Sequence, residues 1–257
     1  MAGGVMAGPL DRLVRIAARR AAAPNGLLFT ERQLYYELCR TILPVHRLPR
    51  RPAFTVPPVV PYRAFRAALD RIGEIPGLLG PPPAAPATVG AHTPEPDLFD
   101  YGLPRLLVCR STAVAAMLRA NGMPMESACP VVSAAELPLD PGVTAMLARA
   151  HGTVYVLHDA TPADLTFPER LPALTDIPDG IDIVPIGLRP AQTAPLHLTQ
   201  TRSTTLGRDR AVEVESVNPA VLLRSVHRLV RDVHRPGNAL IEIRRARRTG
   251  FLTWPAS

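Results

Sequence analysis

Lysine is absent from the chain, so arginine supplies all 29 of its basic residues. Arginine carries a permanent charge and a planar set of donors that matches phosphate and carboxylate oxygens. Together with a net charge of +7, this favours an acidic or polyanionic partner. The chain is also rich in alanine and has 30 prolines, a composition typical of a high-GC bacterium. Part of the arginine excess therefore reflects codon usage.

Cysteine is scarce, and long hydrophobic runs are missing. Cys39, Cys109 and Cys129 are widely spaced and form no Cys-x-x-Cys pair, which argues against a disulfide framework and against a zinc site. The longest apolar runs, such as GTVYVLH at 152–158, are too short to cross a bilayer. The first residues lack the apolar core of a secretory signal. We therefore expect a cytoplasmic protein with reduced thiols and no membrane contact.

Three short helices are predicted within the first 80 residues. The first covers 9–22, where apolar residues fall on one helical stripe with arginines opposite. The second begins at Thr30, which forms a capping box with Gln33, and the third covers 62–73. The run IPGLL at 75–79 is short and apolar, like a wing strand. Three helices followed by a strand or hairpin are the outline of a winged-helix module over 1–80, and also of many generic helical domains.

The second half has a different pattern. Residues 81–100 are proline-rich and predict a linker, followed by a domain over 101–257. Buried-type strands alternate there with helices, which predicts an α/β fold with a mainly parallel sheet flanked by helices. The expected strands are 105–110, 129–134, 153–160 and 181–188; the expected helices are 111–122, 140–152, 162–174 and 219–234.

Ligands of open parallel sheets bind beyond the carboxyl ends of the strands. Two such ends are LLVCRSTAV and VYVLHDATPADL, and the second places His158 and Asp159 at the tip of a strand. The Asp159 carboxylate is a candidate magnesium ligand. The alternative is a structural role, in which Asp159 caps the following turn.

The order of these elements resembles the Toprim domain, the metal-binding α/β module of topoisomerases, primases and related nucleases. That resemblance implies a glutamate after the first strand and an Asp-x-Asp motif after a later strand. In this chain Cys109 or Arg110 stands at the glutamate position. Asp159 takes the place of the first aspartate, and Thr161 stands at the second.

The first half is similar to a second feature of one Toprim group. In the tyrosine-bearing subunit of topoisomerase VI and in the meiotic double-strand-break proteins, a winged-helix domain precedes the Toprim domain and carries a nucleophilic tyrosine in an Arg-x-x-Tyr-Tyr-like signature. The stretch TERQLYY at 30–36 is similar to it, and Tyr36 is the counterpart of the nucleophile. The Toprim proteins of bacterial plasmid-defence systems resemble the chain as well. From helix geometry alone, Tyr35 and Tyr36 remain open to packing with an exposed hydroxyl, to phosphate contact, or to nucleophilic attack.

The departures from the family pattern determine the predicted function. Tyrosine attack on a phosphodiester needs metal ions held by several carboxylates and an activated phenol. Cys109 or Arg110 removes one ligand, whereas arginine can contact phosphate directly. We therefore predict a degenerate Toprim-like protein that binds DNA within a complex, does not cleave it, and needs no cofactor. The alternatives are a Mg²⁺-dependent cleavage protein using Tyr36 and Asp159, and a structural or interaction protein with no role on nucleic acid.

The candidate nucleic-acid contacts are all arginines. The helix that begins at Thr30 would present Arg32 and Arg40 to a DNA backbone if it is a recognition helix, and to solvent otherwise. A basic cluster at the C-terminal end, near the expected strand ALIEI, faces either nucleic acid or an acidic partner. The full set is Arg32, Arg40, Arg110, Arg244, Arg245, Arg247 and Arg248. A protein partner or a homodimer is also expected.

Overall fold

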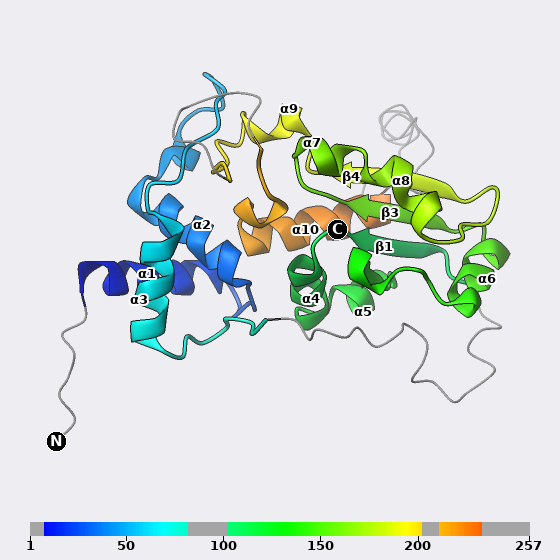
Figure 1. Ribbon diagram of the computed structural model, residues 1–257, viewed down its shortest axis with the longest axis horizontal. Coiled ribbons are helices and arrows are strands. Elements are labelled where there is room, and N and C mark those ends of the chain that lie inside the picture. The colour runs from blue at the N-terminus through cyan, green and yellow to red at the C-terminus, as the bar shows by residue number, and fades with distance from the viewer. Residues whose placement is uncertain (1–7, 82–101, 202–210, 233–257) are drawn as a thin grey trace, which may run out of the picture.

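The computed structural model describes residues 8–81, 102–201 and 211–232. A helical N-terminal module lies at the left of Figure 1, and a sheet with its helices lies at the right. The expected linker at 81–100 falls outside the described residues except for Pro81, and the basic cluster at 244–248 falls outside them entirely. Within the described part of the chain, no helix is both long and apolar enough to cross a membrane.

The N-terminal module consists of three helices, as the sequence predicts. They are α1 (Pro9–Ala21), α2 (Glu31–Ile42) and α3 (Tyr62–Ile72). The capping box is also confirmed: Thr30 Oγ1 accepts from the Gln33 backbone N–H at 3.1 Å, and Gln33 Oε1 accepts from the Thr30 N–H at 2.9 Å. These two bonds satisfy donors that the first turn of a helix leaves free. The apolar stripes of the helices form one core, in which Phe29, Leu34 and Phe65 are fully buried.

The strand expected for the wing at 75–79 is not formed. A single parallel bridge joins Leu78 to Phe29. Gly77 adopts a φ of 84°, a left-handed conformation that interrupts an extended run. The helical character of the module is therefore established, while its winged-helix identity stays a prediction.

The α/β prediction is confirmed. The strands β1 (Arg105–Cys109), β2 (Val131–Ser133), β3 (Thr153–Leu157) and β4 (Asp182–Gly187) form one parallel sheet in the order β2-β1-β3-β4. Its α-helices are α4 (Thr112–Ala120), α5 (Met123–Ser127), α6 (Pro141–Arg149), α7 (Pro162–Leu165), α8 (Phe167–Leu174), α9 (Pro190–Thr193) and α10 (Pro219–Asp232). The 3₁₀ turns are η1 (Val45–Arg47), η3 (Ala134–Glu136) and η4 (Val214–Ser216).

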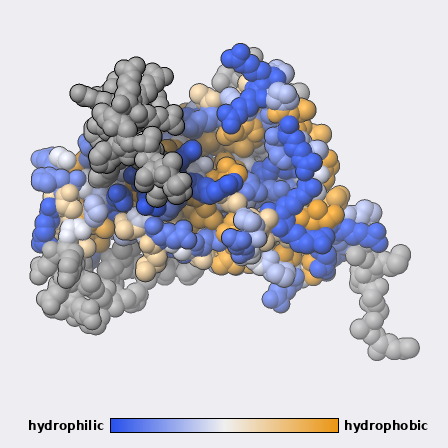
Figure 2. Space-filling model, turned by 180° about the vertical axis from the view of Figure 1, so that it is seen from behind, coloured by the Kyte–Doolittle hydropathy of each residue, from blue (hydrophilic) through white to orange (hydrophobic). Residues whose placement is uncertain are grey.

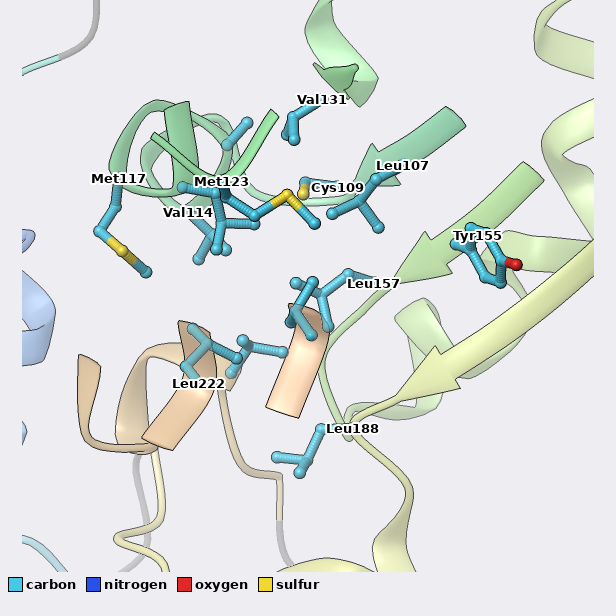
Figure 3. Packing of buried hydrophobic residues seen from close by; sticks show 14 of the residues in the cluster. Leu107, Cys109, Val114, Met117, Met123, Val131, Tyr155, Leu157, Leu188 and Leu222 are labelled. Carbon is cyan, nitrogen blue, oxygen red and sulfur yellow. The ribbon is translucent and has the colours of Figure 1, made fainter. Parts of the chain in front are cut away.

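Alternate residues of the central strands face opposite layers of helices. In Figure 3, Leu107 of β1 and Leu157 of β3 lie on the side that is covered by α4, α5 and α10, where Leu222 approaches them. The intervening residues, such as Val108 and Val156, pack against α6 and α8 on the other side. Burial on both faces explains why these strands are continuously apolar in sequence.

One expected helix is divided in two. The sequence predicts a single helix over 162–174, whereas α7 ends at Leu165 and α8 begins at Phe167. Pro162 and Pro168 each occupy the first turn of one of these helices, where proline's missing N–H costs no hydrogen bond. A proline that starts a new helix therefore breaks the longer one.

The strand order defines where a ligand site would form. From β1 the chain passes to β2 on one side, and from β3 it passes to β4 on the other. Neighbouring strands whose connections leave in opposite directions open a crevice beyond their carboxyl ends. Cys109 ends β1 at this position and Arg110 follows it, and His158 and Asp159 follow β3.

Candidate functional site at the junction of the two halves

A short segment that carries no role in the sequence predictions organises this edge of the sheet. Residues 212–216, VEVES, begin with an antiparallel bridge between Val212 and Ala160, just after β3. The segment then forms η4, which packs against α2 of the N-terminal module. It therefore lies between the two motifs that the family resemblance singles out. We call Tyr36, Asp159, Glu213 and Glu215 the acidic junction.

Tyr36 is fully buried in the acidic junction. Its hydroxyl donates a 2.8 Å hydrogen bond to Glu213 Oε2, and Arg32 Nη1 contacts the same oxygen at 3.0 Å. Burial raises the pKa of Tyr36 above its usual value, and the Glu213 carboxylate raises it further. The possibility that Tyr35 and Tyr36 pack with an exposed hydroxyl is wrong for both residues. Tyr35 is also buried, and it donates to the Val60 carbonyl oxygen at 2.7 Å.

Asp159 contacts the same segment from the sheet. Its Oδ1 accepts the backbone N–H of Val214 at 2.6 Å. Burial raises the pKa of Asp159 to about 6; the Val214 bond opposes this rise, and the nearby charges of Glu213 and Asp164 add to it. The capping role considered for Asp159 falls instead to Thr161, whose hydroxyl accepts from the Asp164 N–H at 3.2 Å.

Glu215, the last member of the acidic junction, contacts the start of α2. Only 7% of its surface is exposed, and its Oε1 accepts the Thr30 hydroxyl at 2.6 Å. Burial raises the pKa of Glu215 to about 7, and Glu213 and Asp159 add to the effect. Thr30 therefore has two functions: it caps α2 and fixes a buried carboxyl of the other half.

The three carboxyl groups of the acidic junction differ in their bonding partners. Glu213 is paired with a cation, Arg32, whereas Asp159 and Glu215 are bonded to a neutral backbone N–H and a neutral hydroxyl. A buried carboxyl without a paired cation is more stable when protonated. Two groups that ionise near neutral pH, Asp159 and Glu215, therefore lie beside the Arg32–Glu213 ion pair.

The described residues show no set of ligands for a magnesium ion at the junction. Each carboxyl already has an oxygen engaged by a protein donor. Cys109, at the position where the family resemblance implies a glutamate, is fully buried, and burial raises the pKa of its thiol. Across residues 8–81, 102–201 and 211–232, no group of three or more His, Cys, Asp or Glu side chains is placed to hold a metal ion.

The structure gives the described candidate arginines protein partners. Arg32 is paired with Glu213 and retains a partly exposed side chain. Arg40 is 8% exposed, binds Glu37 through Nε at 2.9 Å and Nη2 at 2.6 Å, and donates to the Ser216 carbonyl. The predicted phosphate contact by Arg40 conflicts with this burial, because its donors are directed into the protein.

Arg110 is in a more open position. Its Nε binds Asp164 Oδ1 at 2.9 Å, and its guanidinium lies 5.6 Å from the centre of the Phe167 ring. About half of its side chain is exposed. Arg110 therefore remains open to a ligand at the crevice. Arg244, Arg245, Arg247 and Arg248 lie outside the described residues.

Sequence reasoning missed Glu213 and Glu215, which link the two halves. Their signal is the alternation V-E-V-E at 212–215, in which charged and apolar residues share a short extended run. Such a pattern is typical of a half-exposed strand. Only the packing of η4 against α2 shows that its polar side is buried too.

The fold and this junction define an α/β protein in which a helical module closes the carboxyl edge of a parallel sheet. Comparison of the chain with protein-family models, with curated proteins and with solved structures gives no match. The resemblance to Toprim and topoisomerase VI proteins therefore rests on the short motifs of the sequence alone.

Proposed function

We propose that this protein binds DNA through its N-terminal module, does not cleave it, and acts within a complex. The uneven distribution of charge carries the proposal. Residues 8–81 contain twelve arginines and five carboxylates, a net charge of +7, equal to that of the whole chain. Since the remainder of the chain is neutral overall, the positive field belongs to the N-terminal side.

Many arginines of this module point to solvent. Arg12, Arg15 and Arg19 lie on the outer side of α1, and Arg47, Arg50 and Arg51 follow α2; all six are exposed. None of the six forms an ion pair with the described residues. Exposed guanidinium groups outside ion pairs are available to bind phosphate oxygens and release counterions from DNA.

The geometry of Tyr36 supports binding without cleavage. A nucleophilic tyrosine needs access to the phosphate and a phenol that loses its proton readily. Tyr36 is fully buried, and its hydroxyl faces the Glu213 carboxylate, which favours the protonated phenol. The acidic junction therefore serves to join the two halves, and we derive no metal-dependent step from it.

The setting we propose is a cytoplasmic complex. Cys39, Cys109 and Cys129 are all free and buried, which suits a reducing compartment.

DNA binding is tested by fluorescence anisotropy with a labelled duplex of mixed sequence. We expect an affinity that falls steeply as salt rises, because each phosphate contact releases counterions. No binding at low salt contradicts the proposal and supports a structural or interaction protein.

Cleavage is tested separately with supercoiled plasmid in Mg²⁺ or Mn²⁺. We expect no nicking by the wild-type protein. Nicking that is abolished by both Tyr36→Phe and Asp159→Ala would show that the protein is an active cleavage enzyme. The Tyr36→Phe variant must first retain the wild-type circular dichroism spectrum, since the substitution also removes the bond to Glu213.

A further inference from the structure

The segment that follows α2 projects from the N-terminal module. Residues 43–51, LPVHRLPRR, which we call the basic arm, lie in the blue loop at the top left of Figure 1. Viewed from behind, hydrophilic residues form a projection at the top of the molecule (Figure 2). Arg47, Arg50 and Arg51 are exposed on the arm. The sequence has no carboxylate between Glu37 and Asp70, so the arm has no acidic neighbour along the chain.

The basic arm has a defined backbone. Pro44 precedes η1, and the Arg47 N–H donates to the Pro44 carbonyl at 3.1 Å. The Leu48 N–H donates to the Val45 carbonyl at 2.9 Å. Pro49 then restricts the chain, because proline has one accessible range of φ. Less conformational entropy is lost on binding when a segment is already ordered in this way.

The base of the arm is joined to the α/β half of the molecule. The Phe54 N–H donates to the Ala194 carbonyl at 3.2 Å, and the Val56 N–H donates to the Leu198 carbonyl at 2.9 Å. The Gln200 N–H returns a 2.8 Å bond to the Val56 carbonyl. These bonds fix the direction in which the arm leaves the protein.

His197 contacts both ends of the chain segment at the base of the arm. The side chain is 3% exposed; its Nε2 lies 3.0 Å from the Pro49 carbonyl oxygen, and its Nδ1 lies 3.2 Å from that of Phe54. The Phe54 ring packs beside it at a tilt of 46°, with the two ring centres 4.5 Å apart. His197 therefore holds together two points of the chain on either side of Arg50 and Arg51.

Other cations reinforce the positive field near the arm. Burial lowers the pKa of His46, and the charges of Arg40, Arg47 and Arg20 lower it further, against the opposing effect of Glu37. Arg20 Nη1 also contacts Thr41 Oγ1 at 3.2 Å, so α1 contributes a guanidinium to the same region. The guanidinium groups of Arg20 and Arg40 therefore lie near the arm.

Two leucines of the arm stand among these charges. Leu43 is 42% exposed and Leu48 is 54% exposed, and Leu48 lies directly between Arg47 and the Pro49-Arg50-Arg51 run. Proteins that enter a DNA groove combine arginine contacts to the backbone with an apolar side chain placed against the bases. A narrow projecting arm also matches the concave shape of a groove, whereas a flat acidic protein surface offers no place for Leu48.

We propose that the basic arm is the DNA-contacting element, with Arg47, Arg50 and Arg51 on the phosphates and Leu48 inserted in a groove of duplex DNA. This inference rests on the proposed function and adds to it the element and the form of DNA. The α1 arginines then play a secondary part.

The test compares two charge-matched triple variants of the full chain. Arg47→Gln/Arg50→Gln/Arg51→Gln removes the arm cations, and Arg224→Gln/Arg228→Gln/Arg231→Gln removes three exposed cations of α10. At about 0.1 M salt each phosphate contact contributes roughly eightfold in affinity, so the arm variant should bind a labelled duplex about 500-fold more weakly. The slope of log affinity against log salt should fall by about 2.7. The α10 variant should keep both the affinity and the slope.

The groove contact is tested with Leu48→Ala. About half of the Leu48 side chain is still exposed in the free protein, so the loss should be about fivefold, with an unchanged salt slope. A single strand of the same length should bind more weakly than the duplex. Thermal unfolding of every variant, within ~2 °C of wild type, establishes that folding is intact.

The different failures are distinguishable. No duplex binding by the wild type overturns the proposed function itself. Wild-type binding that survives in the arm variant, or that falls equally in the α10 variant, overturns the basic arm alone. The groove contact is overturned if the single strand binds as tightly as the duplex. It is also overturned if polyglutamate binds as tightly as the duplex.

Discussion

Replacing Glu215 with glutamine is expected to stabilise the folded protein above pH 7. The Glu215 carboxyl is buried, and its bonding partner is the neutral hydroxyl of Thr30. A glutamine Oε1 accepts the same hydroxyl bond without carrying a charge. Its amide also has room, because Glu215 lines a pocket of ≈ 670 Å³ between the two halves.

The magnitude follows from the pKa of Glu215, which rises from 4.5 to about 7 on folding. A carboxyl with a raised pKa holds its proton more tightly in the folded state. Its contribution to stability is therefore complete below pH 4.5, is lost as the pH rises to 7, and stays lost above it. One pKa unit corresponds to about 1.4 kcal/mol, so the loss is about 3 kcal/mol. Asp159, with a pKa of about 6, adds to the loss between pH 4 and 6.

Urea unfolding followed by circular dichroism at pH 4.5 and pH 8 measures this difference. We expect Glu215→Gln to match the wild type at pH 4.5 and to exceed its free energy of unfolding by about 3 kcal/mol at pH 8. Glu74→Gln is the control, because Glu74 is an exposed glutamate of the N-terminal module. A Glu215→Gln variant no more stable than wild type at pH 8, or one that gains as much at pH 4.5, would refute the reasoning.

Two further substitutions test the packing around this region by the same unfolding measurement. Arg40→Met should destabilise the protein by about 3–5 kcal/mol, because it leaves the buried Glu37 carboxylate without its cation and the Ser216 carbonyl without a donor; a loss below 1 kcal/mol would show that Arg40 is not structural. Gly152→Ala should cost about 1–3 kcal/mol, since the added Cβ would run into the backbone carbonyl oxygen of Leu103. A Gly152→Ala variant of wild-type stability would contradict that close approach.

The fold class was accessible from sequence because its signals are local. Apolar runs bounded by turn residues predict β1 and β3, and the Thr30–Gln33 pair predicts the start of α2. The short α5 was missed because its five residues contain less than two turns of periodic pattern. The division of 162–174 was missed because a proline is compatible both with a kink and with a new helix.

The candidate site was accessible only in part. Tyr36 and Asp159 were named from motifs, and the structure places both beside residues 212–216. Glu213, which bonds Tyr36, lies 177 residues further along the chain, so no local pattern connects the two. The sequence analysis did not single out the basic arm, and its attachment through His197 depends on bonds across more than 140 residues.

Periodicity, capping and composition are properties of neighbouring residues, and they suffice for the parallel α/β class, the three N-terminal helices and the excess of positive charge. They say nothing of the burial of Tyr36, of the inward direction of Arg40, or of the three carboxyl groups that meet where the halves join. Burial and pKa depend on which distant segments exclude water from a side chain, and those segments come together only on folding.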